Sequence, residues 1–224
     1  MNPRSKSEKF WDRIAKYFDW VEKKDEPINI KIIEKTRNRL NSGYTVLDYG
    51  CGSGTAAIEI ARSVKKINGI DISSKMIELA KRKTEERNVK NFDFAHTTIF
   101  DDKLETGSFD AILCFYLLHL VEDTPKVMQR INDLLKPGGL IISATPCIKG
   151  TYYGFLLPPM SKMGLIPPIK LFKISELENL MTDGNFDIVE VACLDKSGQQ
   201  YYIVAKKKTH GLNPNLQISE SSKL

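Results

Sequence analysis

Three glycines at alternate positions follow a short apolar run in the stretch VLDYGCGSG, residues 46–54. The run has the character of a buried strand, and the apolar residues beyond the glycines recur at helical spacing: Ala57, Ile60, Ala61 and Val64 share one face. A strand, a glycine turn and a helix in this order are typical of an open α/β sheet, so this unit predicts that class of fold.

The alternation of strand and helix patterns continues along the chain. Further strands are predicted at 67–71, 92–96, 109–115, 140–145, 186–194 and 199–207. Two further helices are predicted at about 28–40 and at 74–87. A third begins with Thr124 as its N-cap and stops at 136–139. A fourth begins with a capping box of Ser175 and Glu178 and ends near Gly184. An amphipathic helix at 10–21 precedes them. Strands separated by helices pair in parallel through right-handed crossovers.

The glycines fit poorly with a phosphate site. A dinucleotide fingerprint needs Gly or Ala where this chain has Thr55, and a P-loop needs a lysine that does not follow Gly54. The second strand, however, ends in Asp71, 17 residues after Gly54, where a carboxylate can accept hydrogen bonds from both ribose hydroxyls. The pattern therefore favours a nucleoside without phosphates.

Four motifs together resemble the class I S-adenosylmethionine-dependent methyltransferases. They are VLDYGCGSG (46–54), GID (69–71), GSFDAILCFYLLHLVED (107–123) and LLKPGGLIIS (134–143), in the order and spacing of that family. The opening FWDRIAKYFDW is similar to the first helix of many small-molecule members, including quinone-biosynthesis methyltransferases. The resemblance spans about residues 8–207 and implies a doubly wound, Rossmann-like α/β sheet of seven strands, mostly parallel with the last strand antiparallel and helices on its flanks.

The resemblance also implies a cofactor site for S-adenosylmethionine, with S-adenosylhomocysteine as product. Asp48 and the glycine loop would surround the methionine part, Asp71 would take the ribose, and Ile72 would pack on the adenine. One position departs from the family, because Thr98 stands where an acid normally meets the adenine amino group; Asp101 is the alternative. The implied cofactor residues are Asp48, Gly50, Cys51, Gly52, Gly54, Asp71, Ile72, Thr98, Ile99, Cys114, Phe115 and Tyr17.

Catalytic and substrate residues are less constrained by the sequence. Methyl transfer from a sulfonium needs a base only if the acceptor must lose a proton, and His119 or Tyr116 could supply it; His119 could equally be a wall of the pocket. Tyr152 and Tyr153 could touch the substrate or fill the core of a small cap. The four cysteines are scattered without a metal-ligand pattern, so no metal site is predicted.

The segment 147–170 is the most unusual part of the chain. It holds four prolines, three glycines, three lysines and no acid, and it follows the fifth strand, where this family usually carries a substrate lid. The segment predicts a lid over an apolar or anionic small molecule, including one drawn from a membrane surface. A dimer interface or a simply packed loop are the alternatives, and the chain is expected to be a monomer or a homodimer.

The net charge of +5 raises the question of a nucleic-acid substrate, but the charge is peripheral. Residues 1–40 carry +4 and 206–224 carry +3, which leaves the middle at −2, and no NPPY-type motif of amino-methylating nucleic-acid enzymes follows the fourth strand. RNA methylation and non-catalytic cofactor binding remain the alternatives to a small-molecule enzyme. We expect a cytoplasmic protein with a helical cap (1–42), a methyltransferase domain (43–208) and a disordered tail (209–224).

Overall fold

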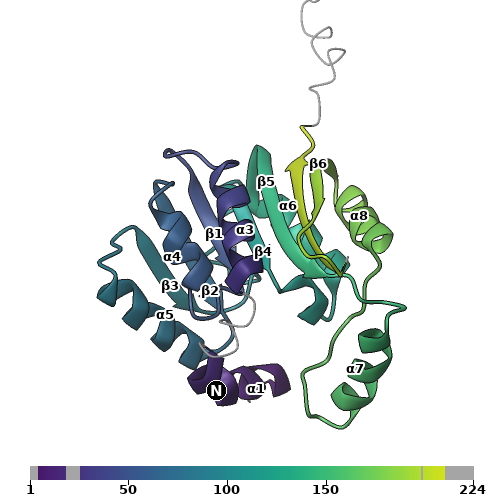
Figure 1. Cartoon of the computed structure of the whole chain (residues 1–224). Helices are drawn as coiled ribbons and strands as arrows, with labels where there is room; N and C mark the ends of the chain where they lie inside the picture. The colour runs from purple at the N-terminus through teal and green to yellow at the C-terminus, as the bar shows by residue number, and fades with distance from the viewer. Residues whose placement is uncertain (1–4, 19–25, 198, 210–224) are drawn as a thin grey trace, which may run out of the picture.

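A seven-stranded sheet forms the centre of the computed structural model, which describes residues 5–18, 26–197 and 199–209 (Figure 1). The spatial order of the strands is β3-β2-β1-β4-β5-β7-β6. Only β7 runs antiparallel to its neighbours β5 and β6. The strands are β1 (Thr45–Tyr49), β2 (Lys66–Asp71), β3 (Phe92–His96), β4 (Phe109–Phe115), β5 (Leu135–Pro146), β6 (Phe186–Cys193) and β7 (Gln200–Lys207). The predicted fold class is confirmed.

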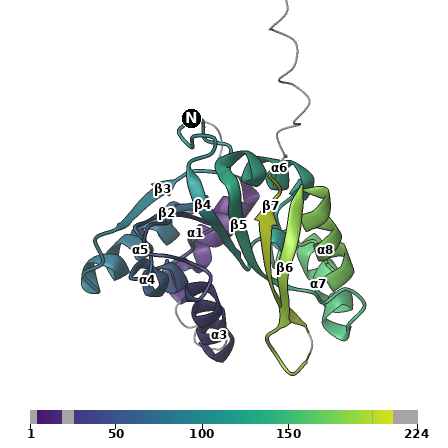
Figure 2. The ribbon, with the colours of Figure 1, turned by 90° about the horizontal axis from the view of Figure 1, so that it is seen from above.

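Helices cover both faces of the sheet, as the right-handed crossovers require (Figures 1 and 2). On one face, α3 (Glu26–Arg37) and α4 (Thr55–Ala61) bury Ile32 and Ile60 against β1 and β4, and α5 (Ser74–Glu86) packs beside α4. On the other face, α6 (Thr124–Leu134) and α8 (Ile174–Asp183) bury Ile131 and Leu177. Each strand of the middle is therefore shielded on both sides, which matches its continuous apolar sequence.

Three predicted boundaries were wrong by a few residues. The N-cap of α6 is Asp123 rather than Thr124, because the Asp123 carboxylate accepts the backbone N–H of Lys126. The capping interaction of α8 comes from Glu176, whose carboxylate accepts the N–H of Lys173, and not from the predicted pair of Ser175 and Glu178. Strand β5 begins at Leu135, since Leu135 pairs with Phe109 ahead of a register shift, so 136–139 lie within the strand.

The irregular segment 147–170 contains a helix, α7 (Tyr152–Lys162), that the sequence did not predict. Thr151 caps it by accepting the N–H of Gly154. Pro158 and Pro159 lie inside the helix, where each removes one backbone donor, and consecutive prolines normally argue for a break. A Cβ at Gly154 would overlap the carbonyl oxygen of Ile148, so the glycine allows the first turn of the helix to lie against the loop that precedes it.

Residues 5–18, the part of the N-terminal segment that the structure describes, form two short elements. They are α1 (Lys6–Ile14) and the 3₁₀ helix η1 (Ala15–Tyr17); residues 19–21 of the predicted helix lie outside the described residues, as do 210–224 of the predicted tail. The division into cap, domain and tail stays a prediction. None of the helices in the described ranges combines the length and apolar character that a membrane span requires.

Candidate functional site

The glycine loop after β1 lies at the carboxyl edge of the sheet and is held against β2. The N–H groups of Gly50 and Cys51 both donate to the carbonyl of Ile70, at 2.8 and 3.0 Å. Gly50 has a φ of 72°, and a Cβ there would lie 2.7 Å from the side chain of Leu117, in the loop after β4. The loops that follow β1 and β4 thus approach each other so closely that only glycine fits.

Asp71, at the end of β2, ties the glycine loop to the start of α5. Its carboxylate accepts the N–H of Gly52 at 3.0 Å and the N–H of Ser73 at 2.8 Å. Burial raises the pKa of this carboxyl, and the two backbone hydrogen bonds oppose that shift. The side chain is therefore fixed in position beside the glycines, as the ribose assignment requires.

Asp48 is a second acid at the same edge, and it is only 4% exposed. Burial first, and the charge of Asp71 second, raise the pKa of Asp48 to about 7. No hydrogen bond or cation among the described residues lowers it. Two neighbouring acids without a cation form a site that suits a positively charged group, and the ammonium of an amino acid is such a group. The residues present therefore fit the cofactor that the sequence resemblance implies.

The end of β4 carries an unusual backbone conformation. Cys114 is fully buried, Phe115 is partly buried, and Tyr116 has a φ of 52°, a left-handed conformation that non-glycine residues seldom adopt. Its N–H donates to Ala144 at 2.7 Å and its hydroxyl donates to the Asn29 side chain at 3.0 Å. These bonds hold the strained residue in place next to the glycine loop, since Leu117 follows directly.

His119 belongs to a short 3₁₀ helix, η2 (Leu118–Leu120), in the loop after β4. Burial lowers the pKa of its imidazole to about 4, so the ring is neutral at physiological pH. Its Nδ1 atom is buried and has no hydrogen-bond partner among the described residues. A buried acceptor or donor of this kind is costly unless a ligand or water satisfies it, which keeps His119 as a candidate base.

The N-terminal elements cover this edge of the sheet. Asp12 of α1 accepts the hydroxyl of Ser73 at 2.7 Å and the N–H of Lys75 at 3.3 Å. The ring of Phe18 lies where a Cβ on Gly52 would touch it at 3.4 Å. Tyr17, by contrast, is 57% exposed. Phe18 rather than Tyr17 is thus the aromatic residue of this segment that packs on the glycine loop.

The residues predicted to lie near the adenine differ in how deeply they are buried. Ile72 is partly buried, and its carbonyl accepts the Nε2–H of His96 at 2.9 Å. Thr98 is exposed, whereas Ile99 is fully buried in the core beneath α6. The thiol of Cys51 is directed at Gly69 on β2, where a Cβ would meet it at 3.1 Å. The side chains of Ile99 and Cys51 are thus occupied by the core and the sheet.

The segment 147–170 is attached to the loop after β4. The N–H of Lys170 donates to the carbonyl of His119 at 2.7 Å, and its ammonium donates to Thr124 at 2.7 Å. Tyr152 and Tyr153, the predicted substrate residues, contact each other edge to face but are 74% and 59% exposed. The tyrosines therefore lie at the surface of α7, and it is the far end of the segment that reaches the candidate base.

Sequence reasoning missed the residues that cover the glycines: Asp12, Phe18 and Leu117. Asp12 is 61 positions from Ser73 in the sequence, and Phe18 is 34 positions from Gly52, and no local pattern marks such partners. The one available signal was the aromatic density of the first helix. Residues 5–18, 26–197 and 199–209 contain no group of three or more His, Cys, Asp or Glu side chains that could hold a metal ion.

Comparison with known proteins places this geometry in one family. Residues 40–209 match the methyltransferase-domain family. A ubiquinone biosynthesis O-methyltransferase of Actinobacillus pleuropneumoniae is 27% identical over 81% of this chain and 79% of its own length. A demethylmenaquinone methyltransferase of Lactococcus lactis is 34% identical, over 48% of this chain and 45% of its own.

A solved structure has the same fold. The structure of an S-adenosylmethionine-dependent methyltransferase from Methanosarcina mazei aligns with a TM-score of 0.62 at 22% identity, over 76% of this chain and 95% of that one. The family match covers the whole sheet and both loops of the site. The chain therefore belongs to the methyltransferase-domain family and is an S-adenosylmethionine-dependent methyltransferase.

Proposed function

We propose that this methyltransferase acts on a small apolar or anionic molecule, which residues 147–170 cover and admit from a membrane surface. The observation that carries the proposal is α7, whose aromatic and aliphatic side chains are exposed at the same edge as the glycine loop (Figure 1). The relatives named for ubiquinone and demethylmenaquinone support a quinone-like acceptor, since both names denote apolar isoprenoid molecules.

The cofactor would be held by the residues that line the carboxyl edge. Asp48 would pair with the ammonium of the methionine part, the backbone of Gly50, Cys51, Gly52 and Gly54 would surround it, and Asp71 would accept the ribose hydroxyls. Ile72 would lie beside the adenine, with the backbone of Thr98 and Ile99. Cys114, through its carbonyl, and Phe115 would lie near the sulfonium, and Phe18 would cover the loop in place of Tyr17.

The chain contributes alignment, exclusion of water and the handling of one proton. The cofactor supplies a methyl group on a sulfonium that already carries a positive charge. The protein orients an acceptor opposite it and shields both from water, which accounts for most of the rate in reactions of this kind. If the acceptor is a hydroxyl, neutral His119 would take its proton, with Tyr116 as the second candidate. Tyr152 and Tyr153 would meet the substrate as it enters.

Transfer of labelled methyl groups tests this function. We expect label from S-adenosylmethionine to enter the solvent-extractable fraction when demethylmenaquinone or a polyprenyl phenol is supplied, and not total tRNA. Asp71→Ala should abolish cofactor binding and also loosen the glycine loop, because Gly52 and Ser73 lose their acceptor. Asp93→Ala, which removes an exposed acid on β3, is the control. Label in RNA alone would contradict the proposed substrate class, and an unchanged affinity of Asp71→Ala would contradict the ribose assignment.

A further inference from the structure

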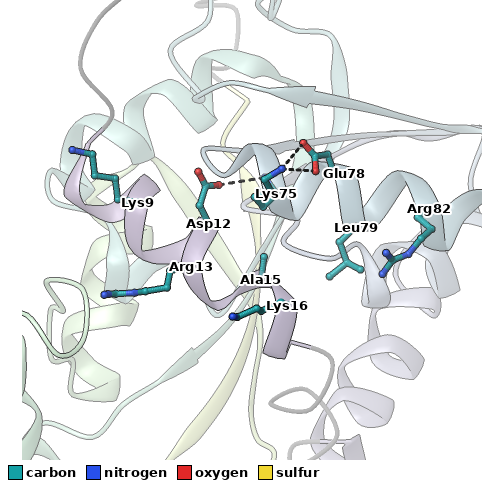
Figure 3. A pocket seen from close by; sticks show the side chains of 9 residues that line it. All are labelled: Lys9, Asp12, Arg13, Ala15, Lys16, Lys75, Glu78, Leu79 and Arg82. Carbon is teal, nitrogen blue, oxygen red and sulfur yellow. Dashed lines mark hydrogen bonds and ion pairs between the residues drawn. The ribbon is translucent and has the colours of Figure 1, made fainter.

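A basic groove of about 590 Å³ runs between α1–η1 and α5, outside the site described above (Figure 3). Ala15 and Leu79 form its buried floor. Lys9, Arg13 and Lys16 line one side at a spacing of four and three residues, which places them on a single helical face. Lys75, Glu78 and Arg82 of α5 line the other side.

The acids of this groove already have partners, whereas three of its bases form no ion pair with an acid. Glu78 pairs with Lys75 at 2.9 Å, and Asp12 accepts hydrogen bonds from Ser73 and Lys75. Lys9, Arg13 and Lys16 are exposed and make no ion pair within the part of the chain that the structure describes. Arg13 lies over the ring of Phe10 at 5.6 Å and Lys16 lies over the ring of Tyr17 at 4.8 Å. The groove therefore presents three cations in a row that are not paired with an acid.

The second component of the surface is α7 with the residues that follow it. Phe155 is 73% exposed and Met163 is 74% exposed, and Leu165 is 57% exposed. Eleven residues of helix are too short to cross a bilayer. No Asp or Glu occurs between Asp133 and Glu176, so nothing in this stretch repels an anionic surface. Exposed aromatic and aliphatic side chains of this density are stabilised when they enter the headgroup region of a membrane.

Both components lie at the same edge of the molecule. In Figure 1, α1 and α7 are the lowest helices, on either side of the edge at which β1 and β4 end. A planar partner could touch both at once, and it would then face the candidate active site.

We infer that the groove cations Lys9, Arg13 and Lys16 and the apolar helix α7 form one docking face for a bilayer that contains anionic lipids. The cations bind lipid headgroups and α7 inserts its side chains between them. The inference rests on the proposed function in that an apolar acceptor would enter the site from that bilayer. RNA matches the cations but leaves the apolar surface of α7 in water, so it satisfies one component only.

Vesicle co-sedimentation of the full-length chain tests the inference. Vesicles of phosphatidylcholine with 30% phosphatidylglycerol are compared with pure phosphatidylcholine, at low and high salt, and soluble tRNA serves as a second polyanion. The groove variant is Lys9→Gln, Arg13→Gln, Lys16→Gln, and the helix variant is Phe155→Ser with Met163→Ser. The control replaces three exposed bases at the opposite edge, Arg62, Lys65 and Lys90, by Gln, which removes the same charge.

We expect the wild type and the control to bind anionic vesicles in a salt-sensitive manner, and the groove variant to bind them on the order of 100-fold more weakly. The helix variant should lose binding to both kinds of vesicle. Equal binding by the groove variant and the control would overturn the inference, as would binding of tRNA in place of vesicles.

A separate activity measurement distinguishes the two proposals. The groove variant should methylate a short-chain, water-soluble acceptor at the wild-type rate and a vesicle-embedded acceptor more slowly. Methylation of quinone precursors without vesicle binding would overturn the docking face alone. Vesicle binding without methylation of any such acceptor would overturn the proposed substrate instead.

Discussion

The buried carboxyl of Asp48 lowers the stability of the folded protein at neutral pH, and it is also the group that we expect to bind the cofactor. Asp48 has its pKa raised to about 7, whereas the ordinary value is 3.8. Between these pH values the unfolded chain carries the charge and the folded protein does not, so unfolding releases a proton. The stability of the cofactor-free protein therefore falls as the pH rises from about 4 to about 7, and the loss is complete above 7.

Asp48→Asn should remove this pH-dependent loss. Because the amide does not ionise, the variant should unfold with a free energy higher by a few kcal/mol at pH 8, while the two proteins converge near pH 4. It should bind the cofactor more weakly, since the ammonium loses its counter-charge. Urea denaturation at pH 5 and pH 8 measures the first effect and calorimetry the second. Asp187→Asn, at an exposed acid, is the control; an equal pH dependence in Asp48→Asn and wild type would refute the argument.

His119 makes an equally specific prediction for catalysis. With a pKa of about 4, the imidazole can accept a proton at every pH above about 5. If it is the base, the rate of methyl transfer to a hydroxyl stays level from pH 5.5 to 8, and His119→Ala lowers kcat on the order of 100-fold with little change in cofactor affinity. His119→Asn separates shape from basicity. Should kcat persist in both variants across this range, the residue only lines the pocket.

Among the elements, α1 lies against the loops that follow β1 and β2, and we expect it to act as a cover that restrains cofactor exchange. The contacts of Asp12 with Ser73 and Lys75, together with Phe18 against Gly52, hold it on the loops that follow β1 and β2. Hydrogen bonds to a charged acceptor contribute about 1.5–3 kcal/mol each when partly buried. We therefore expect the cover to slow dissociation of a bound nucleoside.

Asp12→Ala should speed release of S-adenosylhomocysteine about tenfold while leaving the sheet intact. Stopped-flow displacement measures the rate, and circular dichroism checks the fold. Glu78→Ala is the matched control, because Glu78 lies in the same groove but bonds to the Lys75 side chain instead of to the start of α5. Equal release rates for Asp12→Ala and Glu78→Ala would show that the contact does not restrain the cover.

The elements also show what a sequence can and cannot reveal. Strands β3 and β4 have their predicted bounds, because each is an apolar run between clear turns. The start of β5 was misplaced because its pairing of Leu135 with Phe109 is a long-range contact. Helix α7 was missed because Pro158 and Pro159 argue locally for a break, although Thr151 caps the helix. At the site, Asp48 and Asp71 were found from their place after strands, and the covering residues were not.

At the scale of the whole molecule, the strand order explains where the site lies. From β1 the chain moves outward to β2 and β3, and from β4 it moves the other way to β5. The loops after β1 and β4 therefore leave the sheet in opposite directions and open a crevice between them, which is where open α/β sheets bind their ligands. Gly50 and Leu117 meet at that point, so the topology itself brings the glycine loop and the loop after β4 together.

The reactivity of the four cysteine thiols can show whether the folded structure is intact. Cys193 is exposed, while Cys114 and Cys147 are buried and Cys51 is partly buried in the glycine loop. Burial raises the pKa of the Cys51 and Cys114 thiols and raises that of Cys147 to about 12. Since the thiolate is the reactive species, the native protein should react with a disulfide reagent at pH 8 in one fast phase and three slow ones.

Cys193→Ser should abolish the fast phase, and urea should make all four thiols react at once. S-adenosylhomocysteine should slow the three slow phases further, because a ligand that binds the folded state reduces the population of open states. Cys51, which lies within the cofactor loop, should be slowed the most. A second fast thiol in the native protein would mean that the glycine loop or the core opens readily. That outcome would contradict the close packing of Gly69, Leu117 and Phe18 around the glycine loop.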